Sequence, residues 1–223
     1  RLNTQNQQKS IIAKLKTIPS KTSHIFILSS VFLGIAWLFY RFYGNSVEPV
    51  CVAVRNGNAE AINNTINVDT LCDGQTPICV AAYYGHAETI VALKTAGADV
   101  KMLCDENTTP VYVAARRGHA KAIVALHKAG ASVNTPAKGG FTPVYIAAQE
   151  GHAEVITELY AAGANVSTPA KNGFTPLYAA AQGGHAKAIV ALHKAGATNV
   201  NTPAKNGFTP VYVAALGGHA EAI

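Results

Sequence analysis

Histidine is the residue type in this sequence best suited to metal binding or proton transfer, and it recurs at regular spacing. Five histidines each follow a glycine, and two more recur between them: His86, His119, His152, His185 and His219, then His127 and His193. If they lie on successive packed helices, equivalent histidines are ~10 Å apart. Nitrogen ligands must approach one shared ion to within ~2.1 Å. We therefore predict no metal site and no cofactor.

The four cysteines do not have the spacing of a zinc site. Cys51 and Cys79 stand in an apolar column that we expect to be buried, and Cys72 and Cys104 stand in successive polar segments. A disulfide between these last two would need Cα atoms within ~7 Å, which a full repeat of separation disfavours. The sequence thus predicts free thiols, which favour a reducing compartment.

Motifs of enzyme active sites are missing from the sequence. It has no G-x-S-x-G, G-x-x-x-x-G-K-[ST] or H-E-x-x-H motif and no plausible catalytic pair of carboxylates. We predict that the chain is not an enzyme. N-x-[ST] sequons at Asn63, Asn107 and Asn165 matter only if this region faces a glycosylating lumen.

The elements that hold these residues form a repeat. "TPICVAAYYGHAETI" at Thr76 returns in near-identical form at Thr109, Thr142, Thr175 and Thr209, with spacings of 33, 33, 33 and 34. In each copy Thr-Pro suits a helix N-cap followed by proline at the first helical position, and glycine ends the helix. "HAKAIVALHKAG" predicts a second helix. Glycine two residues before the threonine, replaced once by Asn107, suits a turn with left-handed backbone.

With its period of about 33 residues and its Thr-Pro motif, the chain resembles the ankyrin-repeat family from about residue 48 onward. The resemblance implies an all-α repeat solenoid of helix-turn-helix units with β-hairpin fingers, in which neighbours bury one another's apolar faces. We expect six units in residues 48–223, the first degenerate and the last truncated. The column in which the family usually has histidine holds Cys51 and Cys79, then tyrosine: Tyr112, Tyr145, Tyr178 and Tyr212.

The positions that differ between copies are the candidate partner-binding residues. In ankyrin proteins the pair that ends the first helix lies near the concave surface, and here it includes Tyr83, Tyr84, Arg116, Arg117, Gln149, Glu150, Gln182 and Leu216. The second candidates are the finger lysines Lys138, Lys171 and Lys205, which alanine precedes where the family commonly has aspartate. We hypothesise a non-catalytic scaffold that binds an acidic protein surface. The alternative for the lysines is that they only solubilise the loops.

The basic charge of the chain is concentrated at its N-terminus. Residues 1–48 hold six basic side chains and one acidic, whereas residues 49–223 hold twelve and eleven. The repeats therefore lack the charge excess of a nucleic-acid-binding domain.

Residues 25–43, between a basic tract at 1–24 and a linker at 44–47, form an apolar run. As a helix it would measure about 28 Å, close to the hydrocarbon thickness of a bilayer, and Trp37, Tyr40 and Tyr43 cluster at one end. We expect a single-pass membrane anchor. The basic tract is either a short amphipathic surface helix or a disordered leader.

The side of the membrane on which the repeats lie stays open. The positive-inside rule sends the repeats across the membrane, whereas free thiols favour the reducing side. The chain begins at Arg1 and stops inside a repeat, so we expect a fragment of a longer protein. The alternative function is a regulatory array of an enzyme, channel or secreted effector whose active part lies outside it.

Overall fold

A computed structural model describes residues 49–62, 67–105 and 107–222. The predicted segment 25–43 and its flanks lie outside this part. Within the ranges described, no helix is both long enough and apolar enough to cross a bilayer.

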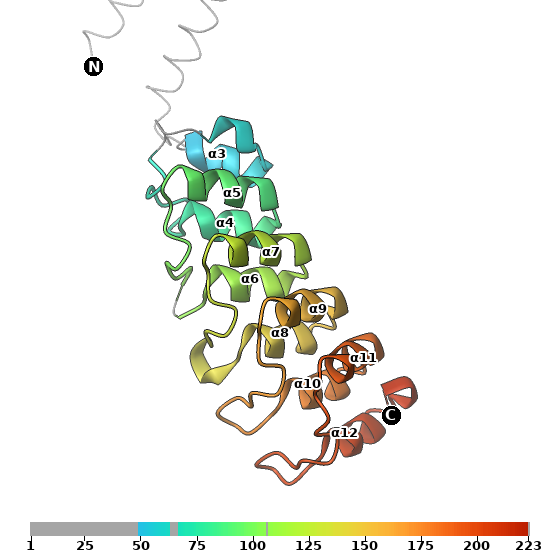
Figure 1. Cartoon of the computed structure of the whole chain (residues 1–223). Coiled ribbons are helices and arrows are strands. Elements are labelled where there is room, and N and C mark those ends of the chain that lie inside the picture. The colour runs from blue at the N-terminus through green and yellow to red at the C-terminus, as the bar shows by residue number, and fades with distance from the viewer. Residues whose placement is uncertain (1–48, 63–66, 106, 223) are drawn as a thin grey trace, which may run out of the picture. The chain divides into compact units, whose positions relative to one another are not determined.

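The described chain is a stack of helix pairs, as the repeat predicts (Figure 1). The first helices of the units are α3 (Pro49–Asn56), α4 (Pro77–Tyr84), α6 (Pro110–Arg117), α8 (Pro143–Gln149), α10 (Pro176–Gln182) and α12 (Pro210–Leu216). The second helices are α5 (Ala87–Thr95), α7 (Ala120–Lys128), α9 (Ala153–Ala161) and α11 (Ala186–Lys194). In the first and last units, the described part of the second helix is only the 3-10 turn η1 (Ala59–Ala61) or η3 (Ala220–Ala222).

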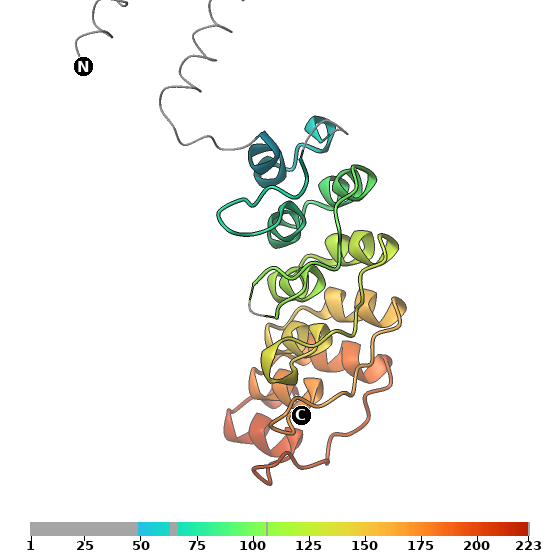
Figure 2. The same cartoon turned by 90° about the vertical axis from the view of Figure 1, so that its left-hand side faces the viewer.

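Each helix packs against its counterparts in the neighbouring units, so two parallel rows run along the stack (Figure 2). The core between them is built from alanines and branched aliphatic residues, with Ile90, Ile123, Ile156 and Leu192 fully buried. Alanine lets the helices approach closely, and the branched side chains fill the remaining volume. The all-α solenoid predicted from the repeat is confirmed.

Five loops, which we call fingers 1 to 5, precede the Thr-Pro steps: residues 70–76, 103–109, 136–142, 169–175 and 203–209. They are tight turns rather than paired strands. Finger 1 is closed by an antiparallel bridge between Cys72 and Gln75, and finger 2 by one between Asp105 and Thr108; finger 3 has the short 3-10 turn η2 (Lys138–Gly140). The described residues include no β-strand.

The local signals in the sequence act as expected. In four units the threonine hydroxyl accepts a hydrogen bond from the backbone N–H three residues later, as at Thr142 and Tyr145 (3.1 Å). Thr76 is the exception, because its hydroxyl donates to Cys79 Sγ instead. Asn107 has a φ of 74°, so it adopts the left-handed backbone that the glycines adopt at this position.

The Gly-His pairs connect each unit to the one before it. In every pair the histidine Nε2 lies 2.9–3.2 Å from a backbone carbonyl oxygen at the end of the preceding first helix; the carbonyls belong to Arg55, Tyr83, Arg116, Gln149 and Gln182. A carbonyl can only accept, so Nε2 carries the hydrogen. The histidines are therefore structural hydrogen-bond donors.

Glycine is required below each of these rings for two reasons. Gly118 has a φ of 81°, which disfavours any residue with a side chain, and a Cβ there would lie 2.9 Å from the ring of His152. The same arrangement recurs at Gly57, Gly85, Gly151 and Gly184. The glycine thus both ends its own helix and makes room for the next unit's histidine.

Apolar side chains on α12 are exposed. Tyr145 is 5% exposed between its neighbours, whereas its counterpart Tyr212 is 48% exposed and Leu216 is 73% exposed.

Replacing Gly118 with alanine is expected to destabilise the array by about 2–4 kcal/mol, because the left-handed backbone strain adds to displacement of the His152 ring. The measurement is urea unfolding of the full chain. Gly130→Ala is the matched control, since Gly130 also has a positive φ (95°) but a Cβ added there would meet nothing within 4 Å. If both variants lose the same stability, the histidine contact contributes nothing.

Candidate functional site

The ends of the first helices form one surface on which the backbone is fixed and the side chains vary. The carbonyl that accepts each histidine bond belongs to the first residue of a variable pair, as at Arg116 and Gln149. The side chains of Tyr84, Arg116 and Gln149 are exposed. The predicted partner-binding positions are thus held in register by their main chain, whatever side chain they carry.

Three of the predicted residues from two units form a cluster. The Arg117 guanidinium lies over the ring of Tyr83, with its Cζ 4.0 Å from the ring centroid, and donates a hydrogen bond to the Tyr83 hydroxyl. Tyr83 and Tyr84 meet edge to face, with ring centroids 5.0 Å apart. The cluster presents aromatic surface and one positive charge, a combination that is common in protein-binding surfaces.

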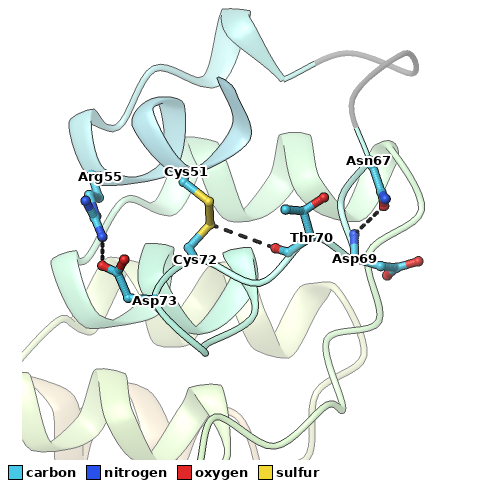
Figure 3. The surroundings of a disulfide bond; sticks show 7 residues. All are labelled: Cys51, Arg55, Asn67, Asp69, Thr70, Cys72 and Asp73. Atoms are coloured by element: carbon cyan, nitrogen blue, oxygen red, sulfur yellow. Dashed lines mark hydrogen bonds and ion pairs between the residues drawn. A yellow bond between two sulfur atoms is a disulfide. The ribbon is translucent and has the colours of Figure 1, made fainter. Parts of the chain in front are cut away.

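A hollow beside this cluster opens between the first helices and the first two fingers. Tyr83, Tyr84 and Arg116 line it with residues absent from the sequence-based prediction: Arg55, Cys72, Asp73, Gln75, Val80, Asp105 and Val113. Arg55 forms an ion pair with Asp73 across its edge (Figure 3). Arg116 therefore lies in a hollow that also contains carboxylates, and this part of the surface carries both signs of charge.

The remaining concave candidates lie further along the stack. Gln149, Glu150, Gln182 and Leu216 are exposed at the ends of α8, α10 and α12, and none lines the hollow. The structure thus divides the predicted helix-end residues into a compact aromatic and charged group at α4–α6 and a spaced row beyond it, which is polar except for Leu216.

The finger lysines lie on loops that contact one another. The backbone N–H of Lys171 donates to the Gly139 carbonyl at 2.9 Å, and Lys205 Nζ donates to the Lys171 carbonyl. The side chains of Lys138, Lys171 and Lys205 are all exposed. Fingers 3 to 5 therefore form a connected edge with lysine at the same place in each.

The prediction of free thiols is wrong, because all four cysteines form disulfides. The pairs are Cys51–Cys72 (Figure 3) and Cys79–Cys104, each with Cα atoms 5.3 Å apart. Cys72 and Cys104, on two successive fingers, do not bond to each other. In the structure each bond instead joins a first helix to the finger that follows it in the chain, where chain reversal brings the two cysteines together.

In other units, packing rather than a disulfide holds the finger against the first helix. The sequence signal that indicates the disulfides is a paired replacement of residues between the two kinds of unit. Where the first helix has tyrosine in place of cysteine, the finger has alanine in place of its cysteine, so that Tyr145 packs with Ala170 and Tyr178 with Ala204. A phenylalanine before Thr-Pro then stacks on the tyrosine, as Phe174 does on Tyr178 with ring centroids 4.4 Å apart. The joint change from two cysteines to tyrosine and alanine is visible in the sequence.

Two buried tyrosines of the column, Tyr112 and Tyr145, remain uncharged at neutral pH. Burial raises the pKa of Tyr112, while the nearby Arg116 lowers it to a smaller extent. Burial also raises the pKa of Tyr145. The phenols therefore act as packing groups and not as proton donors or acceptors near pH 7.

Comparison with known proteins agrees with this geometry. The family model for ankyrin repeats matches three times, over residues 50–137, 88–170 and 144–223. A search among curated proteins found no match.

Breaking the second disulfide with Cys79→Ala and Cys104→Ala is expected to cost about 3 kcal/mol of stability, through the entropy of the opened loop and the lost packing. The triple change Cys79→Tyr, Cys104→Ala and Gln75→Phe reproduces the aromatic pairing of the later units, in which the phenylalanine stands four residues before the tyrosine, and should recover part of this loss under reducing conditions. Urea unfolding with and without dithiothreitol measures both effects. Equal stability of the double-alanine and triple variants would show that the two pairings are not equivalent.

Proposed function

Because the chain belongs to the ankyrin-repeat family, whose repeats are general modules of protein–protein interaction, we propose that residues 48–223 are a non-catalytic scaffold that binds a protein partner. The partner contacts the concave ends of the first helices and the finger tips. The observation that supports this most directly is the histidine bond, which fixes the backbone beneath each variable pair while its side chains stay exposed. A surface of this kind can change its specificity without changing its fold.

The aromatic and charged cluster at α4–α6 is the centre of the proposed contact. Tyr83, Tyr84 and Arg117 together offer a large area at small conformational cost, because Arg117 is already held against Tyr83. The mixed charges of Arg55, Asp73 and Arg116 form its polar border.

Site-specific photo-crosslinking of the full chain in its own cells tests this function. A crosslinker in place of exposed Tyr84 should capture a discrete partner, and the same group at Lys121, which is exposed on α7, should not. Arg117→Glu should reduce capture from position 84 about tenfold, because it replaces the positive charge that lies over the Tyr83 ring with a negative one. Equal capture from positions 84 and 121 would contradict a partner surface at the first helices.

We propose further that residues 25–43 anchor the chain in a membrane and that the repeats lie on the oxidising side. Two features support this orientation. The N-terminal tract has the excess of basic residues that favours retention on the cytoplasmic side. The two disulfides remove the argument for a reducing compartment that free thiols had supplied.

The sequons provide a test of this orientation. Asn107 and Asn165 are exposed and lie outside the helices, so in eukaryotic cells that express the full chain we expect both to receive N-linked glycans if the repeats enter the lumen. Asn107→Gln and Asn165→Gln should each remove one glycosidase-sensitive shift in gel mobility. Asn134→Gln is the control, because Asn134 is also exposed but proline ends its N-T-P triplet. Repeats that carry no glycan and are digested by protease from the cytosolic side would overturn the proposal.

A further inference from the structure

The charge of the fingers changes sign along the stack. The residue after the cysteine or alanine is aspartate in the first two fingers and lysine in the last three: Asp73, Asp105, Lys138, Lys171 and Lys205. Residues 49–106 hold three basic and seven acidic side chains, whereas residues 107–223 hold nine and four. The near-neutral array thus consists of an acidic half, which contains the disulfides, and a basic half, which contains the aromatic pairs.

The basic fingers form a continuous strip, which we call the lysine edge: residues 136–142, 169–175 and 203–209. No acidic residue occurs in any of the three. Hydrogen bonds connect each finger to the next: the Lys171 N–H donates to the Gly139 carbonyl, and Lys205 Nζ donates to the Lys171 carbonyl. The stem of Lys205 also lies against Gly173, where a Cβ would be 2.9 Å from Lys205 Cγ. The strip therefore has fixed backbone beneath its charged side chains.

The acidic fingers are held differently. Asp73 is paired with Arg55, and Asp105 accepts a hydrogen bond from the Thr108 hydroxyl. Each of these fingers is tied to its own first helix by a disulfide. Because Asp105 lies on a fixed loop, an acidic ligand that extended beyond finger 3 would meet a charge of its own sign there, whereas the charge of Asp73 is shared with Arg55.

We propose that the lysine edge binds an extended acidic segment of the partner protein, and that Asp73 and Asp105 fix its direction. The segment's acidic part lies on fingers 3 to 5, and the part that continues toward fingers 1 and 2 is basic or neutral. This inference rests on the proposed function and adds the chemistry and polarity of the ligand. Arg116 lines the hollow and Arg117 lies over the ring of Tyr83, so neither arginine is part of the lysine edge.

The spacing of the strip favours an acidic peptide over nucleic acid. Successive units of the stack lie ~10 Å apart. An extended segment in the polyproline II conformation has three residues per turn and a rise of ~3.1 Å, so a carboxylate at every third residue recurs on one side at about the same interval. Single-stranded nucleic acid is bound where aromatic side chains offer stacking platforms among basic residues. Here the aromatic residues of the fingers, such as Phe141 and Phe174, pack on tyrosines.

The test uses the full chain in detergent and a synthetic 15-residue peptide of serine and glycine with glutamate at every third position. Lys171→Glu with Lys205→Glu should weaken peptide binding about tenfold at low salt, and salt should weaken binding to the unmodified chain. The matched control is Lys187→Glu with Lys194→Glu, which changes the net charge equally on exposed positions of α11. Equal weakening by the two double variants would overturn the proposal, as would tighter binding of a 12-nucleotide single strand than of the peptide.

Two longer peptides test the direction. One continues the acidic sequence with three lysines at the same spacing, and the other continues it with three more glutamates. The lysine-extended peptide should bind several-fold more tightly, and Asp73→Asn with Asp105→Asn should remove most of that difference. If the glutamate-extended peptide binds as tightly to the unmodified chain, Asp73 and Asp105 do not fix the direction of the bound segment. Retained crosslinking of a partner at position 84 would then show that the scaffold function survives the failure of this inference.

Discussion

The whole array depends on one recurring contact, in which a histidine ring of each unit sits over a glycine of the unit before it and donates to a helix-end carbonyl. The bond satisfies a carbonyl that the end of a helix leaves without an intrahelical partner. The ring needs the space that only glycine leaves, as at Gly118 beneath His152. Because the same geometry recurs from His86 to His219, the stacking distance and register are set at each step.

This constraint separates what must stay the same from what can change. The bond acts on main-chain oxygen, so it makes no demand on the side chain of Tyr83, Arg116 or Gln149. The apolar residues beneath, such as Ile123 and Ile156, are fully buried and set the shape of the core. Variation is therefore tolerated at the helix ends and costly a few residues away, which is the condition under which a repeat array can acquire a specific partner.

The sequence was sufficient for the repeat and its local signals because these depend on neighbouring residues. Thr-Pro caps, glycine stops and the left-handed Asn107 each follow from the conformational preference of one or two residues. The positions of Tyr83 and Arg117 at the ends of first helices were also predictable from the repeat. Their stacking on each other was not, because it depends on how two units are rotated and which rotamers they leave open. The hollow with Asp73 and Asp105 required finger geometry that no local pattern supplies.

The disulfides were missed because equivalent positions were compared between units, whereas the bond forms within one unit. The two kinds of link hold the same elements together, a first helix and the finger that follows it. The aromatic side chain acts through burial, and Tyr145 is 5% exposed where neighbouring units cover it. A covalent bond such as Cys51–Cys72 holds the finger to its helix without a large buried side chain. The change from disulfide to aromatic pairing along the stack thus replaces a covalent link with one that depends on the burial of a large side chain.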